Sequence, residues 1–303
     1  MTNITTQSRI NSKQNTLSGI TLGLFTVFIG SILSVVVKFI SSDVNIFTII
    51  FFQFGICLLC IMPWLITNGI NELKTDQPVT HFIRGVFGCL SFYAFYFSIN
   101  HISLAEASLL RHSAPLIVPL ILFFFYRTKI PLVRWSALLL GFIGITIILR
   151  PTQGQFSFWH LIGLCSGIGL AFSMVLTRKL SKYEPEKRIL FYYFLISLLG
   201  STPLFIINFK PIPMQTIPWL LLIGLGMYFA FIPYTRAYAY AKSSIVSATS
   251  YFAVIYAGLF DWLLWDILPK QYTVIGTLVI LLAGLIIVRE SIMEEKRFSE
   301  SSQ

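Results

Sequence analysis

Residues 17–38 read LSGITLGLFTVFIGSILSVVVK, an apolar run that contains no carboxylate and ends at Lys38. A helix needs about 20 consecutive apolar residues to cross a hydrocarbon core about 30 Å thick. The run therefore predicts a transmembrane helix. Comparable runs recur along the chain, and they predict an all-α membrane protein with ten spans at 17–38, 46–68, 82–100, 104–125, 132–150, 158–179, 189–209, 216–239, 243–264 and 271–289.

The composition supports this class. Of the 303 residues, 56% are hydrophobic and 11% are charged, whereas soluble domains contain about 25% charged residues. The net charge of +10 would suit a nucleic-acid partner if the basic residues formed a patch, but they lie between the apolar runs. We therefore predict contact with the lipid bilayer and no binding of nucleic acid.

The basic residues also predict the orientation of the chain. With the N-terminus in the cytoplasm, 16 Lys and Arg residues, Arg84 among them, fall on that side when Arg111 and Arg236 are set aside as intramembrane. Four fall on the other side, namely Lys38, Arg150, Lys210 and Lys270. Because an excess of Lys and Arg marks the cytoplasmic loops, we predict a bacterial inner-membrane protein with both termini in the cytoplasm. Residues 1–16 form the N-tail, and residues 290–303 form a C-tail that we expect to be disordered.

An internal repeat divides the chain. An offset of about 140 residues aligns Leu22-Gly-Leu24 with Ile162-Gly-Leu164, and a second aligned pair begins at Gly144 and Gly284. Transporters often contain such repeats. Because each copy holds five spans, an odd number, the second copy must enter the membrane inverted. We predict repeats at 17–150 and 158–289, with a cavity between them at the bilayer midplane.

Several short motifs lie in or between these spans: Arg84-Gly-Val-Phe-Gly88, Ile102-Ser-Leu-Ala-Glu-Ala107, Ser113-Ala-Pro-Leu116 and Ser243-Ser-Ile-Val-Ser-Ala248. With them the chain resembles the EamA-type carriers of the drug/metabolite transporter superfamily over nearly its whole length. The resemblance implies a secondary transporter without a cofactor. Its substrate class would be that of the family, whose members carry amino acids, aromatic metabolites, nucleosides or S-adenosylmethionine.

The chain departs from many members of that family after the fourth span. They have Gly-Glu where this chain has Tyr126-Arg127, while the corresponding place in the second half holds Asp266. If the acidic residue gates or couples ions in those members, that role is in doubt for the first half of this chain.

Ionisable residues within the spans are the candidates for a substrate site, because a charge in hydrocarbon costs several kcal/mol and usually faces a partner or a wet cavity. The fourth span contains Glu106, Ser108, Arg111 and His112. Ser108 and His112 share one helical stripe, which Arg111 flanks. Arg111 either faces the substrate or is a structural partner of Glu106 or of a neighbouring helix. We expect Glu106 and Asp261, in the ninth span, to act in gating or coupling.

Further candidates surround this stripe. Arg111, His112 and Arg236 supply positive charge, although Arg236 can instead extend to the headgroups. Aromatic rings suited to stacking and cation–π contact come from Tyr93, Tyr96, Tyr228, Tyr238 and Tyr251. Ser247 belongs to a stripe in the ninth span that serves either helix packing or cavity lining. These residues predict a small anionic or zwitterionic substrate with an apolar or aromatic part. The aromatic rings would also suit a sulfonium or ammonium substrate.

Other classes find less support. The four cysteines, Cys57, Cys60, Cys89 and Cys165, lie inside predicted spans. Cys57 and Cys60 have C-x-x-C spacing but no second Cys pair accompanies them, so we expect no metal site and no disulfide. No nucleotide-binding or hydrolase motif is present, and we expect no enzyme activity. An intramembrane lipid-modifying transferase and a channel are the alternatives. His112 is the candidate for proton coupling because histidine titrates roughly between pH 5 and 8, and a homodimer is the candidate assembly.

The topology is directly testable. Single-cysteine labelling in intact cells should place the Ser181–Arg188 loop in the cytoplasm and the Pro151–Ser157 loop outside, as the basic-residue bias predicts. Labelling of both loops from the same side would contradict both the span count and the inverted repeat.

Overall fold

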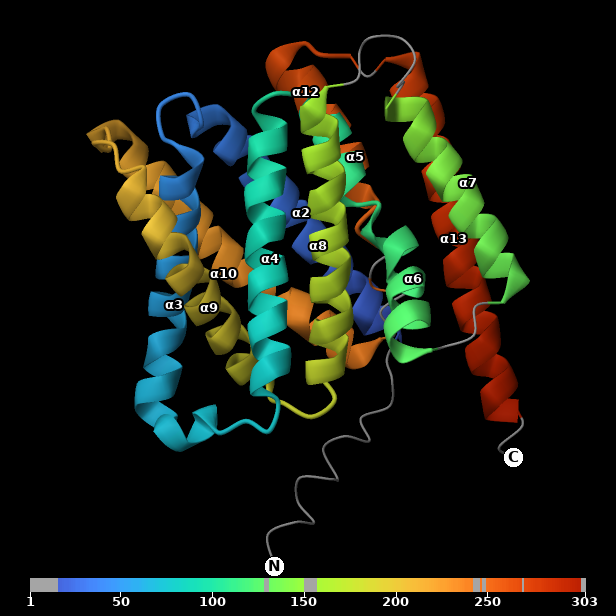
Figure 1. The fold of residues 1–303 in the computed structure, drawn as a ribbon, viewed down its shortest axis with the longest axis horizontal. Helices are drawn as coiled ribbons and strands as arrows, with labels where there is room; N and C mark the ends of the chain where they lie inside the picture. Colours follow the sequence, from blue (N-terminus) through green and yellow to red (C-terminus); the bar gives the residue numbers. More distant parts are fainter. Residues whose placement is uncertain are drawn as a thin grey trace, which may run out of the picture.

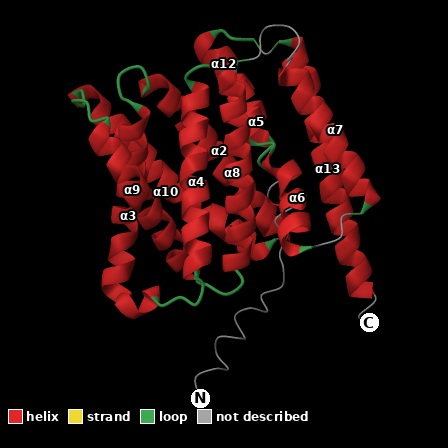
Figure 2. Cartoon of the chain, in the orientation of Figure 1, coloured by secondary structure: helices red, strands yellow, loops and turns green. Residues whose placement is uncertain are grey.

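The computed structural model describes residues 16–127, 131–149, 157–241, 246, 249–268 and 270–300. Within these ranges the chain is helical and contains no strand (Figures 1 and 2). Two 3₁₀ turns, η1 (Ile70–Leu73) and η2 (Met214–Thr216), lie between helices. The α-helices are α2 (Thr16–Ile40), α3 (Ile46–Asn68), α4 (Pro78–Ile99), α5 (Leu104–Arg111), α6 (Ala114–Tyr126), α7 (Leu132–Leu149), α8 (Phe158–Leu180), α9 (Glu186–Ile207), α10 (Ile217–Tyr240), α12 (Phe252–Trp265) and α13 (Gln271–Glu300).

The described helices account for the apolar runs. Seven helical stretches are long and apolar enough to cross a membrane, and three shorter apolar helices cover Trp135–Ile147, Phe252–Trp265 and Gln271–Ile286. The protein is therefore an integral, multi-pass membrane protein. One expectation was wrong: the tail predicted to be disordered from residue 290 continues α13 as far as Glu300.

The fourth predicted span is broken into two helices. α5 ends at Arg111 and α6 begins at Ala114, with His112 and Ser113 between them. Pro115 lies in the first turn of α6 and has no N–H, so it cannot donate to the carbonyl of Arg111 in a continuous helix. The proline thus stops one helix, and it is tolerated where the next helix begins.

The two halves have matching local structure. α2 and α8 are both followed by a five-residue turn, 41–45 and 181–185, before the next helix starts. α6 and α12 are each followed directly by a residue with left-handed backbone geometry, namely Arg127 (φ 51°) and Asp266 (φ 52°). The halves also interlock, because α4 packs on α8 and α10 packs on α2. The third helix of each half therefore contacts the first helix of the other.

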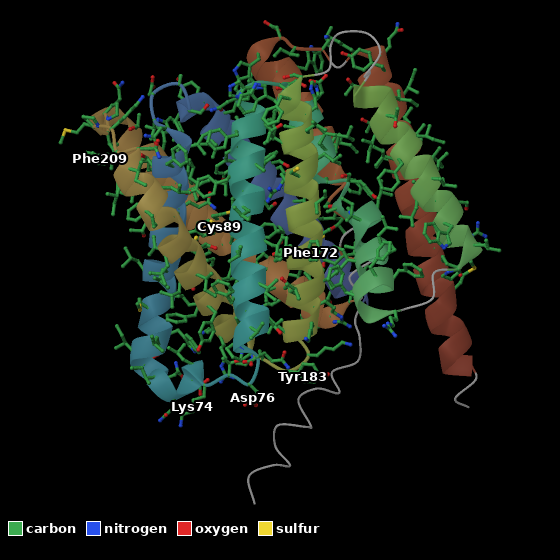
Figure 3. All side chains as sticks on the ribbon, viewed as in Figure 1. Lys74, Asp76, Cys89, Phe172, Tyr183 and Phe209 are labelled. Carbon is green, nitrogen blue, oxygen red and sulfur yellow. The ribbon has the colours of Figure 1, made fainter. Side chains whose placement is uncertain are left out.

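Loops and helix ends gather at the two ends of the bundle. Figure 3 shows Lys74, Asp76 and Tyr183 at the end where α13 finishes, and Phe209 near the opposite end. We call these the Tyr183 end and the Phe209 end. The side-chain amide of Asn45 donates to the backbone carbonyl oxygen of Asn208 at 2.8 Å. This bond places the 41–45 turn at the Phe209 end.

Glycines on α8 allow the broken fourth span to approach closely. A Cβ added to Gly167 would lie 2.5 Å from the carbonyl oxygen of Leu110 and 3.1 Å from that of Arg111. A Cβ on Gly163 would meet Ser98 and Leu110 at 2.9 and 3.0 Å. Small residues at such spacing let membrane helices pack tightly, so Gly163 and Gly167 hold the end of α5 against α8.

This contact predicts a position-specific effect of adding one methyl group. Gly167→Ala should reduce the free energy of unfolding by roughly 1–3 kcal/mol, the usual cost of overpacking, because the clash is with backbone. Gly200→Ala is the matched control, since a Cβ there meets nothing within 4 Å. Thermal unfolding in detergent should show the difference, and equal melting temperatures for the two variants would contradict it.

Candidate functional site

A cavity of about 130 Å³ lies among helices of both halves, and its volume far exceeds that needed for one water molecule. α2 contributes Thr26, Ser31 and Ser34, whereas α8 contributes Ser173. Its other polar and aromatic lining residues are Ser91, Phe92, Phe95, Ser108, Arg111, His112, Tyr193, Phe231, Tyr234 and Ser250. The cavity is thus mostly apolar and aromatic, with a few hydroxyls and cationic or titratable groups.

Arg111 is the charged residue of this lining, and its side chain is held by α4. One guanidinium nitrogen, Nη1, donates to the carbonyl oxygen of Ser91 at 2.8 Å and to its hydroxyl at 2.9 Å. The guanidinium carbon lies 4.5 and 4.8 Å from the ring centroids of Phe92 and Phe95. Among the described residues no carboxylate forms an ion pair with it. The described residues therefore orient the charge of Arg111 but do not neutralise it.

The break in the fourth span places this charge beside the cavity. Leu110 and His112 flank Arg111. The backbone N–H of His112 donates to the carbonyl oxygen of Ser108, and the hydroxyl of Ser113 donates to the carbonyl oxygen of Leu110. The imidazole Nδ1 of His112 is buried without a hydrogen-bond partner. Irregular backbone at membrane depth is tolerated where protein or a cavity satisfies it, and here both are present.

In the second half, the start of α12 lies next to the cavity. α12 begins at Phe252, directly after a turn at Ser250 and Tyr251, and both Ser250 and Ala253 line the cavity. The predicted residue Ser247 lies outside the described residues. The cavity thus lies beside the interrupted helix of the first half and the start of α12 in the second half; many transporters bind their substrates beside interrupted helices.

Ser108, Arg111 and His112 all line the cavity, whereas the tyrosines named in the sequence prediction lie elsewhere. Tyr96 is buried and donates to the side chain of Gln53 at 2.5 Å. Outside the cavity lining, Tyr93 packs on Phe47, Tyr228 on Phe194, Tyr238 on Tyr234, and Tyr251 against Gly284. These four rings are packing residues in this conformation.

Arg236 is also remote from the cavity lining. Its side chain is 53% exposed and forms an ion pair with Glu186 at 2.7 Å. The aromatic rings that do line the cavity are Phe92, Phe95, Tyr193, Phe231 and Tyr234, none of which was predicted from the sequence. The signal that could have found Phe95 is its spacing from Gly88 and Ser91, which puts all three on one face of α4.

The two acidic candidates lie towards the Phe209 end, in a separate pocket of about 350 Å³. Asp261, 1% exposed, forms an ion pair with Lys38 at 3.0 Å and accepts a hydrogen bond from the amide of Ala105 at 2.7 Å. It therefore joins α2 to the N-terminus of α5. Glu106 lies 4.0 Å from His160 and has no ion pair with Arg111.

Comparison with known proteins agrees with this architecture. The profile of the EamA-like transporter family matches residues 17–150 and 157–289. The chain belongs to the EamA-like transporter family. This chain is 28% identical over 275 residues to the pseudopaline exporter CntI of Pseudomonas aeruginosa (strain UCBPP-PA14). The match covers 90% of this chain and 96% of that protein.

Two further relatives are named for other compounds. The S-adenosylmethionine uptake transporter of Rickettsia prowazekii is 24% identical over 272 residues, covering 90% of this chain and 92% of that protein. The riboflavin transporter of Vibrio cholerae is 26% identical over 254 residues, with coverages of 82% and 85%. A solved crystal structure shares the fold, with a TM-score of 0.67 and 17% identity over 92% of this chain and 99% of that one. The protein is therefore a transporter of small metabolites and not an enzyme.

The Lys38–Asp261 pair makes a measurable prediction. Lys38→Met and Asp261→Asn should each reduce stability, and the double variant should lose less than the sum, because the two side chains depend on each other. We expect a coupling energy of about 1–3 kcal/mol from unfolding of the four proteins in detergent. Additive effects would show that the ion pair does not stabilise this conformation.

Proposed function

We propose that this EamA-family protein is a secondary carrier that moves a small anionic or zwitterionic metabolite through the central cavity by alternating access. The observation that carries the proposal is Arg111, a buried guanidinium that lines the cavity, is oriented by Ser91 and lacks a carboxylate partner among the described residues. Removal of a charge from water is costly unless an opposite charge meets it. A carboxylate of the substrate would supply that charge, and the rings of Phe92 and Phe95 would contact its apolar part.

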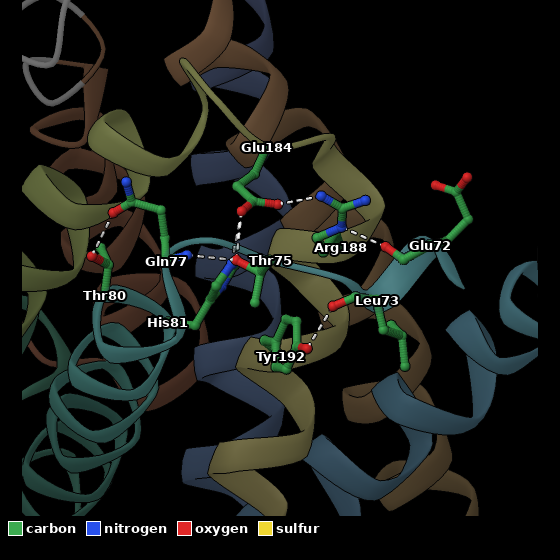
Figure 4. A network of polar contacts seen from close by, with 9 residues as sticks. All are labelled: Glu72, Leu73, Thr75, Gln77, Thr80, His81, Glu184, Arg188 and Tyr192. Carbon is green, nitrogen blue, oxygen red and sulfur yellow. Dashed lines mark hydrogen bonds and ion pairs between the residues drawn. The ribbon is translucent and has the colours of Figure 1, made fainter. Parts of the chain in front are cut away.

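Alternating access requires a closure at each end of the cavity. At the Phe209 end the candidate is the contact of Asp261 with Lys38 and Ala105. At the Tyr183 end the candidate is the polar network of Figure 4, in which Glu184 accepts from Thr75 at 2.5 Å and from Arg188 at 2.7 Å.

The network in Figure 4 joins the two loops of the Tyr183 end. Arg188 also donates to the carbonyl oxygen of Glu72, and the hydroxyl of Tyr192 donates to the carbonyl oxygen of Leu73 at 2.7 Å. These bonds connect the segment between α3 and α4 to the start of α9. If either this network or the contact of Asp261 with Lys38 and Ala105 opened while the other stayed closed, the cavity would be exposed to one side of the membrane at a time.

We further propose that the two halves are inverted repeats and that the Tyr183 end faces the cytoplasm. Support comes from the odd number of spans predicted for each half, the packing of α4 on α8 and of α10 on α2, and the basic-residue bias. His112 is the proposed coupling group. Its imidazole lines the cavity beside Arg111, so a proton on His112 and an anion on Arg111 would favour each other's binding.

Uptake into proteoliposomes tests the proposal. The purified protein should transport at least one of radiolabelled S-adenosylmethionine, L-phenylalanine and L-glutamate, each of which carries a carboxylate. Arg111→Ala should nearly abolish this uptake, and Arg111→Lys should raise the KM because lysine keeps the charge but loses the planar fork of donors.

The matched control is Arg236→Gln, which removes an exposed arginine that does not line the cavity. It should transport like the wild type. Wild-type uptake by a well-expressed Arg111→Ala protein would show that Arg111 is structural, and would move the substrate contacts to the serines and aromatic rings of the cavity.

A further inference from the structure

A second arginine, Arg84, lies on the Tyr183 side of the cavity, and most of its N–H donors have no hydrogen-bond partner. Arg84 of α4, which the topology prediction counts among the cytoplasmic cations, is fully buried at 0% exposure. Its Nε donates to the hydroxyl of Thr177 at 2.7 Å, and its guanidinium carbon lies 4.2 Å from the ring centroid of Tyr193. Both Nη1 and Nη2 are buried without a partner. Among the described residues no carboxylate pairs with it.

Arg84 continues the cavity-lining face of its helix. Arg84, Gly88, Ser91 and Phe95 follow one face of α4 at i, i+4, i+7 and i+11, and the last three line the cavity. At a rise of 1.5 Å per residue, Arg84 lies about 10 Å along the axis from Ser91, the partner of Arg111. The direction is towards the Tyr183 end, because α4 runs from the η1 segment towards α5.

The neighbouring helices repeat this arrangement. On α8, Ser173 lines the cavity and Thr177, the partner of Arg84, lies one turn further towards the Tyr183 end. On α10, Tyr234 lines the cavity and Tyr238 lies one turn further, with the two rings 4.9 Å apart. Three helices thus extend their cavity-facing stripes into one buried polar cluster.

Two tyrosines connect the cavity to this cluster. Tyr193 and Tyr234 both line the cavity. The guanidinium carbon of Arg84 lies 4.2 Å from the ring centroid of Tyr193, and the rings of Tyr234 and Tyr238 lie 4.9 Å apart. We call the rings of Tyr193 and Tyr234 the floor of the cavity.

We propose that Arg84 is a second anion site on the transport path, which receives the carboxylate of the substrate from Arg111 when the floor of Tyr193 and Tyr234 opens towards the Tyr183 end. This inference rests on the proposed carrier function and adds a second substrate-binding site to it. The ligand chemistry is a carboxylate, because two adjacent N–H donors of a planar guanidinium match its two oxygens.

The energetics favour this role over a structural one. A buried charge is stabilised only when its partners replace the lost water, and Arg84 has one hydroxyl and one ring. An apolar side chain of similar length would fill the same space without that cost. A guanidinium with free donors next to a substrate cavity is therefore expected to act on an anion, since intramembrane charges usually mark transport paths.

Three variants test the second site in proteoliposomes and detergent, with radiolabelled S-adenosylmethionine, L-phenylalanine and L-glutamate as probes. In Arg84→Met, equilibrium binding should stay within about threefold of wild type because Arg111 is intact, while the uptake rate should fall about tenfold or more. Arg84→Lys should recover part of the rate. The melting temperature of Arg84→Met should equal or exceed that of wild type, because an unpaired charge is removed.

Arg236→Gln is the control, since it removes an arginine that is exposed and does not line the cavity. It should transport nearly as well as wild type. Wild-type uptake by Arg84→Met would overturn the second site alone, and so would an Arg84→Met protein that fails to fold or an Arg236→Gln protein that loses uptake equally. If the wild-type protein neither binds nor transports any of the three probes, the proposed carboxylate carrier itself is overturned, and the second site with it.

Discussion

The hydrocarbon interior of a membrane offers no hydrogen-bond partner to a peptide group, and this constraint governs the whole protein. Continuous helices satisfy it along most of the chain. The interruption at His112 and Ser113 is allowed because Ser113 bonds back to Leu110 and because Gly167 lets α8 cover the exposed carbonyls. The same interruption brings Arg111 to the cavity, so the tolerated backbone irregularity and the candidate site are one feature.

Charge inside the bundle follows a clear division. Carboxylates pair with cations near the two ends, as in Lys38 with Asp261 and Arg188 with Glu184. Around the cavity, by contrast, Arg84 and Arg111 contact hydroxyl, carbonyl and aromatic groups and no carboxylate of the described chain. The Lys38–Asp261 pair thus joins α2 to α12 near the Phe209 end, whereas the two buried arginines have no counter-ion among the described residues.

Much of the architecture was predictable because hydrocarbon selects for length and polarity, which a sequence displays directly. Among the described residues, seven of the apolar runs form helices long enough to cross a membrane and three form shorter apolar helices. Ser108, Arg111 and His112 were identifiable as polar groups in a span. Tyr93, Tyr96, Tyr228, Tyr238 and Tyr251 were chosen by residue type, yet in the structure they pack against Phe47, Gln53, Phe194, Tyr234 and Gly284. Residue type does not reveal which face of a nearly uniform apolar helix points inwards.

The sequence by itself determined the class of protein, the two EamA repeats and the presence of a buried charge in the fourth span, because each depends on the order of residues along one helix or on a repeated order. Only the tertiary structure decided that Ser91 orients Arg111, that Arg236 lies at the surface, that Asp261 pairs with Lys38, and that Arg84 lies beneath Tyr193. These contacts join helices distant in sequence, and the rotation and depth of each helix relative to its neighbours arise from close packing at residues such as Gly167.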